Sequence, residues 1–200
     1  MKSLFFKISC YVLLSMLFFT ACNSDFTARK RGYFKIDFPE KQYKLFDQPG
    51  YPYKFEYPVY AKIIKDSTFF DRKPENDWWI NIDFPSFNGK VFISYKEIGK
   101  KNNFDTLIND AFKLGYGQHT QKATAIEPVP FTTPSGVEGI YFSLSGNTAT
   151  ANQFFVTDTT KHFLRGALYF DATPNEDSLG IVNDFLKEDL KYLINSLTWK

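Results

Sequence analysis

WWINIDFPSFNGKVFISYKEI, residues 78–98, is the stretch that decides the fold of this chain. Apolar and polar side chains alternate in WWINIDF and again in KVFISYKEI, as they do in strands with one buried face. Between the two halves, Asn88-Gly89 supplies the positive φ that a hairpin turn requires. The stretch therefore predicts an antiparallel strand pair. Its apolar faces are formed by Ile80, Ile82 and Phe84 on one strand and by Val91, Ile93 and Tyr95 on the other.

The same alternation recurs between turn-forming residues along most of the chain. Aromatic residues make up 19% of the sequence, and such side chains suit half-buried strands. A second hairpin is predicted at Asp158-Thr159-Thr160. The sequence thus predicts a meander-like antiparallel sheet of six or more strands. The predicted strands lie near 33–37, 53–57, 60–65, 78–84, 89–95, 123–129, 138–145, 152–157 and 161–170.

Two segments have the period of a helix instead. Asn103 can cap a helix with apolar residues from Phe104 to Phe112, and Gly115 can end it. A longer apolar stripe runs from about Ser178 to Ser196, with Asp177 or Ser178 as the cap. The predicted fold class is α+β: a single domain, mainly antiparallel β-sheet packed by a mid-chain helix and a long C-terminal helix.

The N-terminus has the three parts of an export signal. A basic start is followed by an apolar run over 8–19 and by the small residues Thr20 and Ala21 before Cys22. The run is too short to cross a bilayer, which takes about 20 residues. Phe19-Thr20-Ala21-Cys22 resembles a lipobox, although lipoboxes usually carry Leu where this chain has Phe19. The alternative is an ordinary signal peptide with Cys22 as an incidental thiol.

These features divide the chain into three parts. We expect residues 1–21 to be a lipoprotein signal peptide, 22–32 a lipidated tether, and 33–200 a single α+β domain. Cys22 is the expected lipidation site, and acyl chains such as palmitate on it would hold the protein at a membrane.

Charge and cysteine content exclude several kinds of function. Without residues 1–21 the chain has 22 basic and 22 acidic side chains, whereas nucleic-acid binding needs a clustered basic excess. No nucleic acid is therefore expected as a partner. Cys10 leaves with the signal and lipid occupies Cys22, so no thiol remains for a disulfide or a metal.

Signals for catalysis are weak throughout the sequence. The two histidines, His119 and His162, have no neighbour at metal-ligand spacing, so no metal and no cofactor are expected. A Ser-His-Asp triple of Ser145, His162 and Asp171 lacks a G-x-S-x-G motif. The adjacent acids Glu188-Asp189 look like solvated helix surface. We expect no enzyme. An enzyme that uses His162 with a nearby carboxylate is the weakest alternative.

Aromatic side chains are the remaining candidates for a binding surface. Trp78 and Trp79 are neighbours on a predicted strand, so they must face opposite sides, and at most one belongs to the core. The other, with Phe87 at the hairpin tip, is a candidate partner-binding anchor. The competing interpretation is that this second tryptophan is buried under a helix or under the 67–77 loop. Arg31 and Tyr33 are further candidates for partner contacts.

Several stretches together resemble a known family. They are RGYFKIDFPEKQY at 31–43, INIDFPSFNGKVFISYK at 80–96, HTQKATAI at 119–126, GNTATANQFFVTD at 146–158, HFLRGALYF at 162–170 and PNEDS at 174–178. They are similar to the GldD family of gliding-motility lipoproteins of the Bacteroidota. The resemblance implies a non-enzymatic envelope component required for gliding and for type IX secretion, with other gliding and secretion lipoproteins and envelope proteins as partners. The one residue role it carries over is lipidation at Cys22.

The order of elements also resembles PsbP/Mog1-like domains, which are commonly binding or assembly modules. Lipoproteins of this phylum bound for the outer surface usually have an acidic cluster after the cysteine, whereas this chain has only Asp25 there. We therefore expect the domain to face the periplasm, on the inner leaflet of the outer membrane in preference to the inner membrane. The alternative function is a periplasmic lipoprotein that binds glycan or lipid in a concave aromatic pocket.

Overall fold

The computed structural model of the chain describes residues 35–65, 73–117 and 119–200. Within it, residues 36–200 form one compact unit. Cys22, Arg31 and Tyr33 lie outside the described residues, as do the expected signal peptide and lipidated tether.

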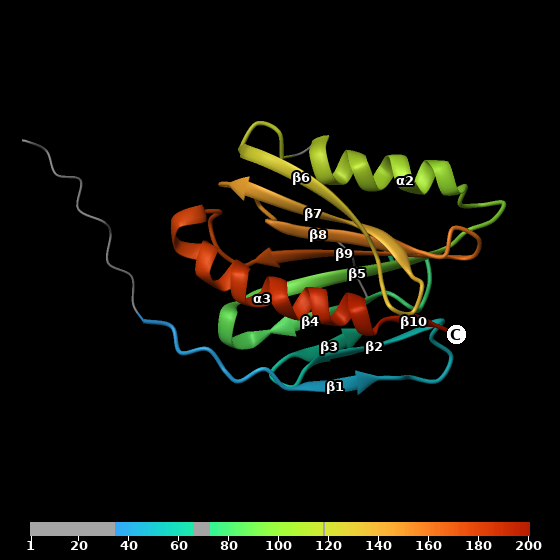
Figure 1. Ribbon diagram of the computed structural model, residues 1–200, viewed down its shortest axis with the longest axis horizontal. Helices are drawn as coiled ribbons and strands as arrows, with labels where there is room; N and C mark the ends of the chain where they lie inside the picture. Colours follow the sequence, from blue (N-terminus) through green and yellow to red (C-terminus); the bar gives the residue numbers. More distant parts are fainter. Residues whose placement is uncertain (1–34, 66–72, 118) are drawn as a thin grey trace, which may run out of the picture. The chain divides into compact units, whose positions relative to one another are not determined.

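Seven antiparallel strands form the main sheet, in the order β3-β4-β5-β9-β8-β7-β6 (Figure 1). Their bounds agree closely with the predicted strands, because each strand carries the alternation of a sheet with two different faces. The strands are β3 (Lys62–Lys65), β4 (Ile80–Phe84), β5 (Gly89–Glu97), β6 (Ala123–Thr132), β7 (Glu138–Gly146), β8 (Asn152–Thr157) and β9 (His162–Phe170).

The β4–β5 hairpin forms as the sequence indicates, with two local differences. A 3-10 turn, η1 (Pro85–Phe87), precedes Asn88, and Asn88 alone takes the positive φ, at 48°. Gly89 is already the first residue of β5. The first strand begins at Ile80, so the two tryptophans precede it rather than belong to it.

The predicted simple meander is wrong in one respect, which concerns the partner of β5. After β5 the chain passes through a helix to the far edge of the sheet at β6, and then returns strand by strand. The last strand, β9, pairs with β5 along the full nine residues of both. Two meanders are thus joined at their long central strands, a pairing that no local turn signal reveals.

A smaller sheet has the order β1-β2-β10, with β1 (Tyr43–Phe46), β2 (Tyr53–Pro58) and β10 (Thr198–Trp199). The sequence predicted only β2. In the described part of the predicted strand at 33–37 there is no strand, and β1 begins further along. β1 and β10 are four and two residues long, too short to show a period.

Both predicted helices are present. α2 (Phe104–Phe112) begins at Asn103, whose side chain accepts a hydrogen bond from the Asp105 N–H at 2.9 Å. It continues into a π-helical turn, η2 (Lys113–Gly117). α3 (Glu176–Ser196) is capped by Asn175 rather than by either predicted residue, and so begins two residues earlier.

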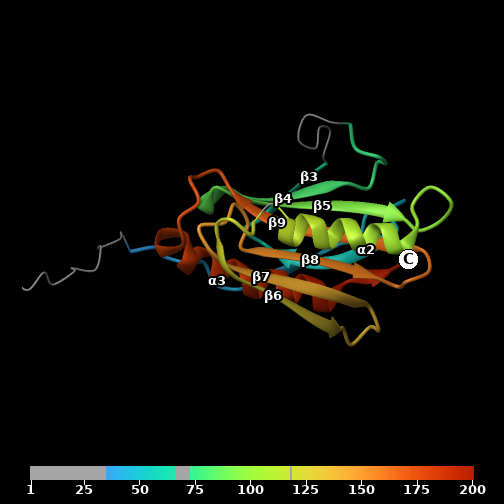
Figure 2. The same ribbon diagram turned by 90° about the horizontal axis from the view of Figure 1, so that it is seen from above.

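The helices cover opposite faces of the main sheet (Figure 2). α3 and the small sheet cover one face, where the inward residues of β4, β5 and β9 form the larger core. α2 packs on the other face, against Phe142, Phe155 and Phe163 of β7, β8 and β9. No helix in the described ranges has both the length and the apolar content needed to cross a membrane.

Candidate functional site

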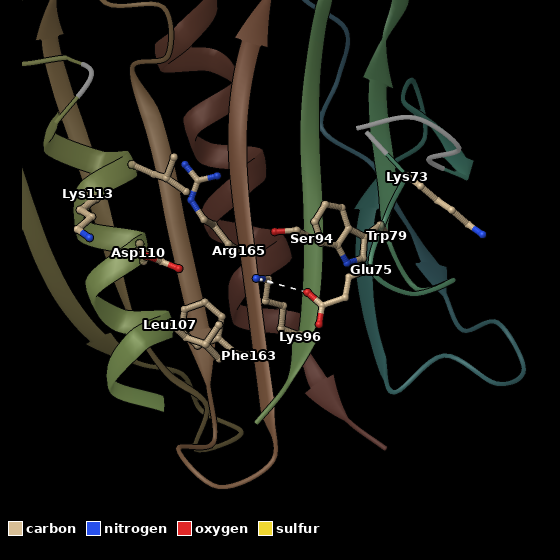
Figure 3. A pocket seen from close by; sticks show the side chains of 12 residues that line it. Lys73, Glu75, Trp79, Ser94, Lys96, Leu107, Asp110, Lys113, Phe163 and Arg165 are labelled. Carbon is tan, nitrogen blue, oxygen red and sulfur yellow. Dashed lines mark ion pairs between the residues drawn. The ribbon is translucent and has the colours of Figure 1, made fainter. Parts of the chain in front are cut away.

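A cavity of about 740 Å³ lies between α2 and the main sheet (Figure 3). Its lining comes from β5, β9, α2 and the segment that leads into β4. The apolar part of the wall includes Trp79, Leu107 and Phe163. Charged side chains from the sheet and from the end of α2 surround it. The volume lies in the range of about 300–1,000 Å³ that is typical of small-molecule sites.

Strand alternation explains which side chains reach this cavity. On β5, Ile93 and Tyr95 face the larger core, so Ser94 and Lys96 face α2. On β9, Leu164 lies in the same core, and its neighbours Phe163 and Arg165 are turned to the cavity side. Within HFLRGALYF, residues 162–170, Arg165 is the only Lys, Arg, Asp or Glu. Its side chain lies on the face of the sheet that α2 covers.

Among the described residues, Arg165 has only neutral hydrogen-bond partners. Its guanidinium donates to the side-chain oxygen of Gln153 and interacts with Tyr169. Burial lowers the pKa of the Arg165 guanidinium. Among the described residues, no carboxylate lies within ion-pair distance of it. The side-chain N–H2 of buried Gln153 also lacks a partner there. Around Arg165 and Gln153, the described side chains therefore offer more hydrogen-bond donors than acceptors.

The rim of the cavity is richer in cations than in anions. Lys73, Lys96 and Lys113 line it beside the acids Glu75 and Asp110. The Glu75 carboxylate lies 3.4 Å from the Lys96 ammonium and 3.1 Å from that of Lys101, which is outside the cavity lining. The negative charge of Glu75 is therefore already neutralised. Burial raises the pKa of Glu75, but its hydrogen bonds and the nearby lysines outweigh this and lower the pKa overall.

The predicted aromatic anchors are largely packed. Trp79 is 9% exposed, donates from Nε1 to the Tyr95 carbonyl at 2.8 Å, and lines the cavity. Trp78 is half-buried against the edge of the Tyr95 ring, and Phe87 packs on Phe185. The structure does not gather the three on one exposed surface. Their role in partner binding, like that of the two candidates outside the described residues, stays a prediction.

A second polar site fastens the start of the compact unit to α3. We call residues 36–46 the strap. Asp189 is 1% exposed and forms an ion pair with Lys41 of the strap at 2.7 Å. The same carboxylate accepts hydrogen bonds from the hydroxyls of Tyr43, at 2.9 Å, and Tyr60. Burial, and then the bond to Asp189, raises the pKa of both hydroxyls.

The reading of Glu188-Asp189 as solvated surface is therefore wrong for Asp189. Adjacent helix residues point about 100° apart, so Glu188 faces solvent while Asp189 faces the strap. Aromatic contacts extend the attachment: Phe38 stacks on Phe185 with ring centroids 4.3 Å apart. Lys41 lies 3.5 Å above the Phe185 ring centre.

The histidines are built into the packing. His162 is 4% exposed, its Nδ1 lies 2.7 Å from the Tyr95 hydroxyl, and its ring stacks on Trp199. Burial lowers the pKa of both His162 and His119. His162 and Asp171 lie at opposite ends of β9, about 30 Å apart at 3.3 Å per residue, so the Ser-His-Asp triple does not assemble. In the described ranges, no three potential ligands cluster in a way that could hold a metal.

The fold and these two sites define a class of protein: a single α+β domain with an N-terminal strap and an amphipathic cavity between α2 and the main sheet. A family model described as "Gliding motility lipoprotein GldD" matches residues 23–199, and the chain belongs to this family. The resemblance found in the sequence is confirmed. No curated protein matches the chain.

Two solved structures are similar to this chain, at low sequence identity. One is a cyanobacterial PsbP (CyanoP) from Synechocystis sp. PCC 6803, at 10% identity and TM-score 0.49, covering 86% of this chain and 99% of that one. The other is the Ran-binding protein Mog1p of Saccharomyces cerevisiae, at 10% identity and TM-score 0.48, covering 80% and 96%. The predicted α+β class is confirmed by the helices and sheets of the structure itself, and these two structures are of the kinds that the order of elements resembles.

Proposed function

We propose that the chain is a non-catalytic, lipid-anchored component of the gliding apparatus that acts by binding and assembling other envelope proteins. The observation that carries this proposal is the family match, which spans nearly the whole chain after Cys22. A motility lipoprotein family implies association with a membrane. The finer parts of the proposal are a role in type IX secretion, a periplasmic orientation, and preference for the inner leaflet of the outer membrane.

Lipidation of Cys22 would place the domain close to the bilayer. Thirteen residues, 23–35, lie between Cys22 and Ile36, where the compact unit begins. The fourteen steps from Cys22 to Ile36, at about 3.4 Å each, give a fully extended reach of about 50 Å. The domain would therefore meet its partners within roughly one domain diameter of the membrane surface.

The strap supports an anchoring role because it gives the tether a firm point of attachment. Lys41 and Asp189 join segments 148 residues apart in the sequence, and Phe38 and Phe185 stack beside them. A force applied to the N-terminal end of the strap would be transmitted to α3 through these contacts, rather than only separating the edge strand β1 from its sheet.

Exposed apolar side chains and sheet edges support a role in protein–protein assembly. Several large apolar side chains are exposed, including Leu45 on β1 and Ile181 on α3. In the described part of the chain, β1, β3 and β6 each lie at the edge of a sheet with one strand neighbour. Such edges and apolar residues are usual components of protein contacts.

Deletion of the gene, with single-cell gliding speed and secretion of a type IX cargo both measured, tests the proposal. We expect both to be lost, and both to be restored by the wild-type chain. Normal gliding in the deletion strain would overturn the motility assignment. Lost gliding with normal secretion would remove only the secretion part. Photo-crosslinkers placed at Leu45 and Ile181 would then identify which envelope proteins contact these surfaces.

A further inference from the structure

We infer that the cavity between α2 and the main sheet binds a small amphipathic organic anion: one carboxylate or phosphate group joined to an apolar chain. Arg165 would take the charged group, and the wall formed by Leu107, Phe163 and Trp79 would take the chain (Figure 3). This inference goes beyond the proposed motility function and does not depend on it.

The first argument is the unbalanced charge of Arg165. A guanidinium has five N–H donors and stays charged in proteins, and its burial is unfavourable unless an anion accompanies it. The described residues offer Arg165 only the neutral side chains of Gln153 and Tyr169. Burial lowers the pKa of Arg165, and the pKa of His119 is lowered by its own burial and then by the charge of Arg165. An incoming anion would supply the missing counter-charge.

The second argument is the orphan donor beside it. The Gln153 side-chain oxygen accepts from Arg165, while its N–H2 group is buried without a partner among the described residues. Buried polar groups are paired in about nine cases of ten. A carboxylate or phosphate has the several acceptor oxygens that this corner of the fold lacks.

The third argument is the rim. Lys113 and Lys73 line the cavity with no ion pair among the described residues. Of the two rim acids, Glu75 is paired with Lys96 and Lys101, which leaves Asp110 against these two lysines and Arg165. The positive excess would draw an anion to the mouth of the cavity.

The shape decides between a small molecule and a partner protein. A concave site of about 740 Å³ has the size of a small-molecule site, whereas protein partners usually bury a broad surface of about 800 Å² on each side. The lining combines apolar and charged side chains, so the ligand must carry both characters. A purely polar anion such as inorganic phosphate would leave that wall unfilled.

Binding of matched ten-carbon probes to the full mature chain tests the inference, with Cys22→Ser so that no attached lipid competes. Decanoate and decyl phosphate supply the two anionic groups, and 1-decanol is the neutral match. Calorimetry and the fluorescence of Trp79 report binding. We expect both anions to bind at least about tenfold more tightly than the alcohol, because a charge-assisted hydrogen bond contributes about that factor. The ratio of the two anions tells which headgroup is preferred.

Two variants and a control locate the site. Arg165→Gln should weaken anion binding about tenfold or more while leaving the unfolding temperature unchanged or higher, because it removes a half-buried charge that has no counter-ion among the described residues. Lys113→Glu, on the exposed rim, should weaken binding several-fold without affecting the core. Lys122→Glu, exposed and outside the cavity lining, should bind as the wild type does.

Three results would each overturn the inference. One is equal affinity for decanol and the anions. Another is unchanged affinity in both Arg165→Gln and Lys113→Glu. The third is no binding of either anion at about 1 mM, with an acidic amphipathic peptide binding instead.

Discussion

Replacing Asp189 by Ala removes the acceptor on which the strap depends. The carboxylate is 1% exposed and is bound by the Lys41 ammonium at 2.7 Å and by the hydroxyls of Tyr43 and Tyr60. Breaking a fully buried ion pair costs about 3–5 kcal/mol. Lys41 is 31% exposed and can turn to solvent, so the lower end applies. We expect the free energy of unfolding to fall by about 3 kcal/mol.

Urea unfolding of the mature Cys22→Ser chain, followed by tryptophan fluorescence, measures this change. Glu188→Gln is the matched control: the same helix, one residue away, with a carboxylate that is 62% exposed and pairs with Lys191. It should cost less than about 0.5 kcal/mol. Asp189→Asn keeps the shape without the charge and should fall between the two.

Hydrogen exchange adds a local test, because the strap should open first. In Asp189→Ala we expect the amides of β1 to exchange faster than those of β9, whose pairing the change does not touch. The reasoning fails if Asp189→Ala costs no more than Glu188→Gln, or if β1 keeps its wild-type protection.

Further predictions concern pH and two glycines. Burial lowers the pKa of His119 and His162 below the ordinary 6.5, so the unfolded state binds protons first as the pH falls. Stability should therefore fall as the pH drops below about 6.5, and His119→Gln should flatten this slope in pH-dependent melts. Gly180→Ala should raise stability by about 0.5–1 kcal/mol in urea unfolding, because nothing lies within 4 Å of the added Cβ inside α3. Gly139→Ala should lower it by about 1–3 kcal/mol, since that Cβ would lie 2.2 Å from the Phe155 carbonyl oxygen. Equal midpoints for the two glycine variants would contradict the packing described for β7.

The main sheet and both helices could be predicted because their signals are local. Alternation in 78–98 places Ile82 and Ile93 on one face, and both are buried in the larger core. Asn103 caps α2 as its position before Phe104 indicates. The pairing of β5 with β9 could not be predicted, because it joins strands separated by a helix and three other strands.

The two sites were harder to find from sequence, for different reasons. Lys41 and Asp189 are far apart in the chain, and no spacing rule connects them. Asp189 does sit between Leu186 and Leu190 on the apolar stripe of α3, which is a signal of burial. The sequence also contains a signal for Arg165, because it is a single cationic residue within an otherwise apolar strand. Its partners depend on how β8 and β9 are aligned, and the sequence does not specify that register.

Gliding by cells whose only copy of the protein carries Cys22→Ser tests the central claim most directly. This variant, exported through an ordinary signal peptide to wild-type levels, keeps the strap, the cavity and the fold but has no lipid. We predict folded, periplasmic protein and cells that do not glide, while the wild-type chain restores movement. Cells that glide at wild-type speed with the unanchored protein would contradict the claim that lipid anchoring is part of its function.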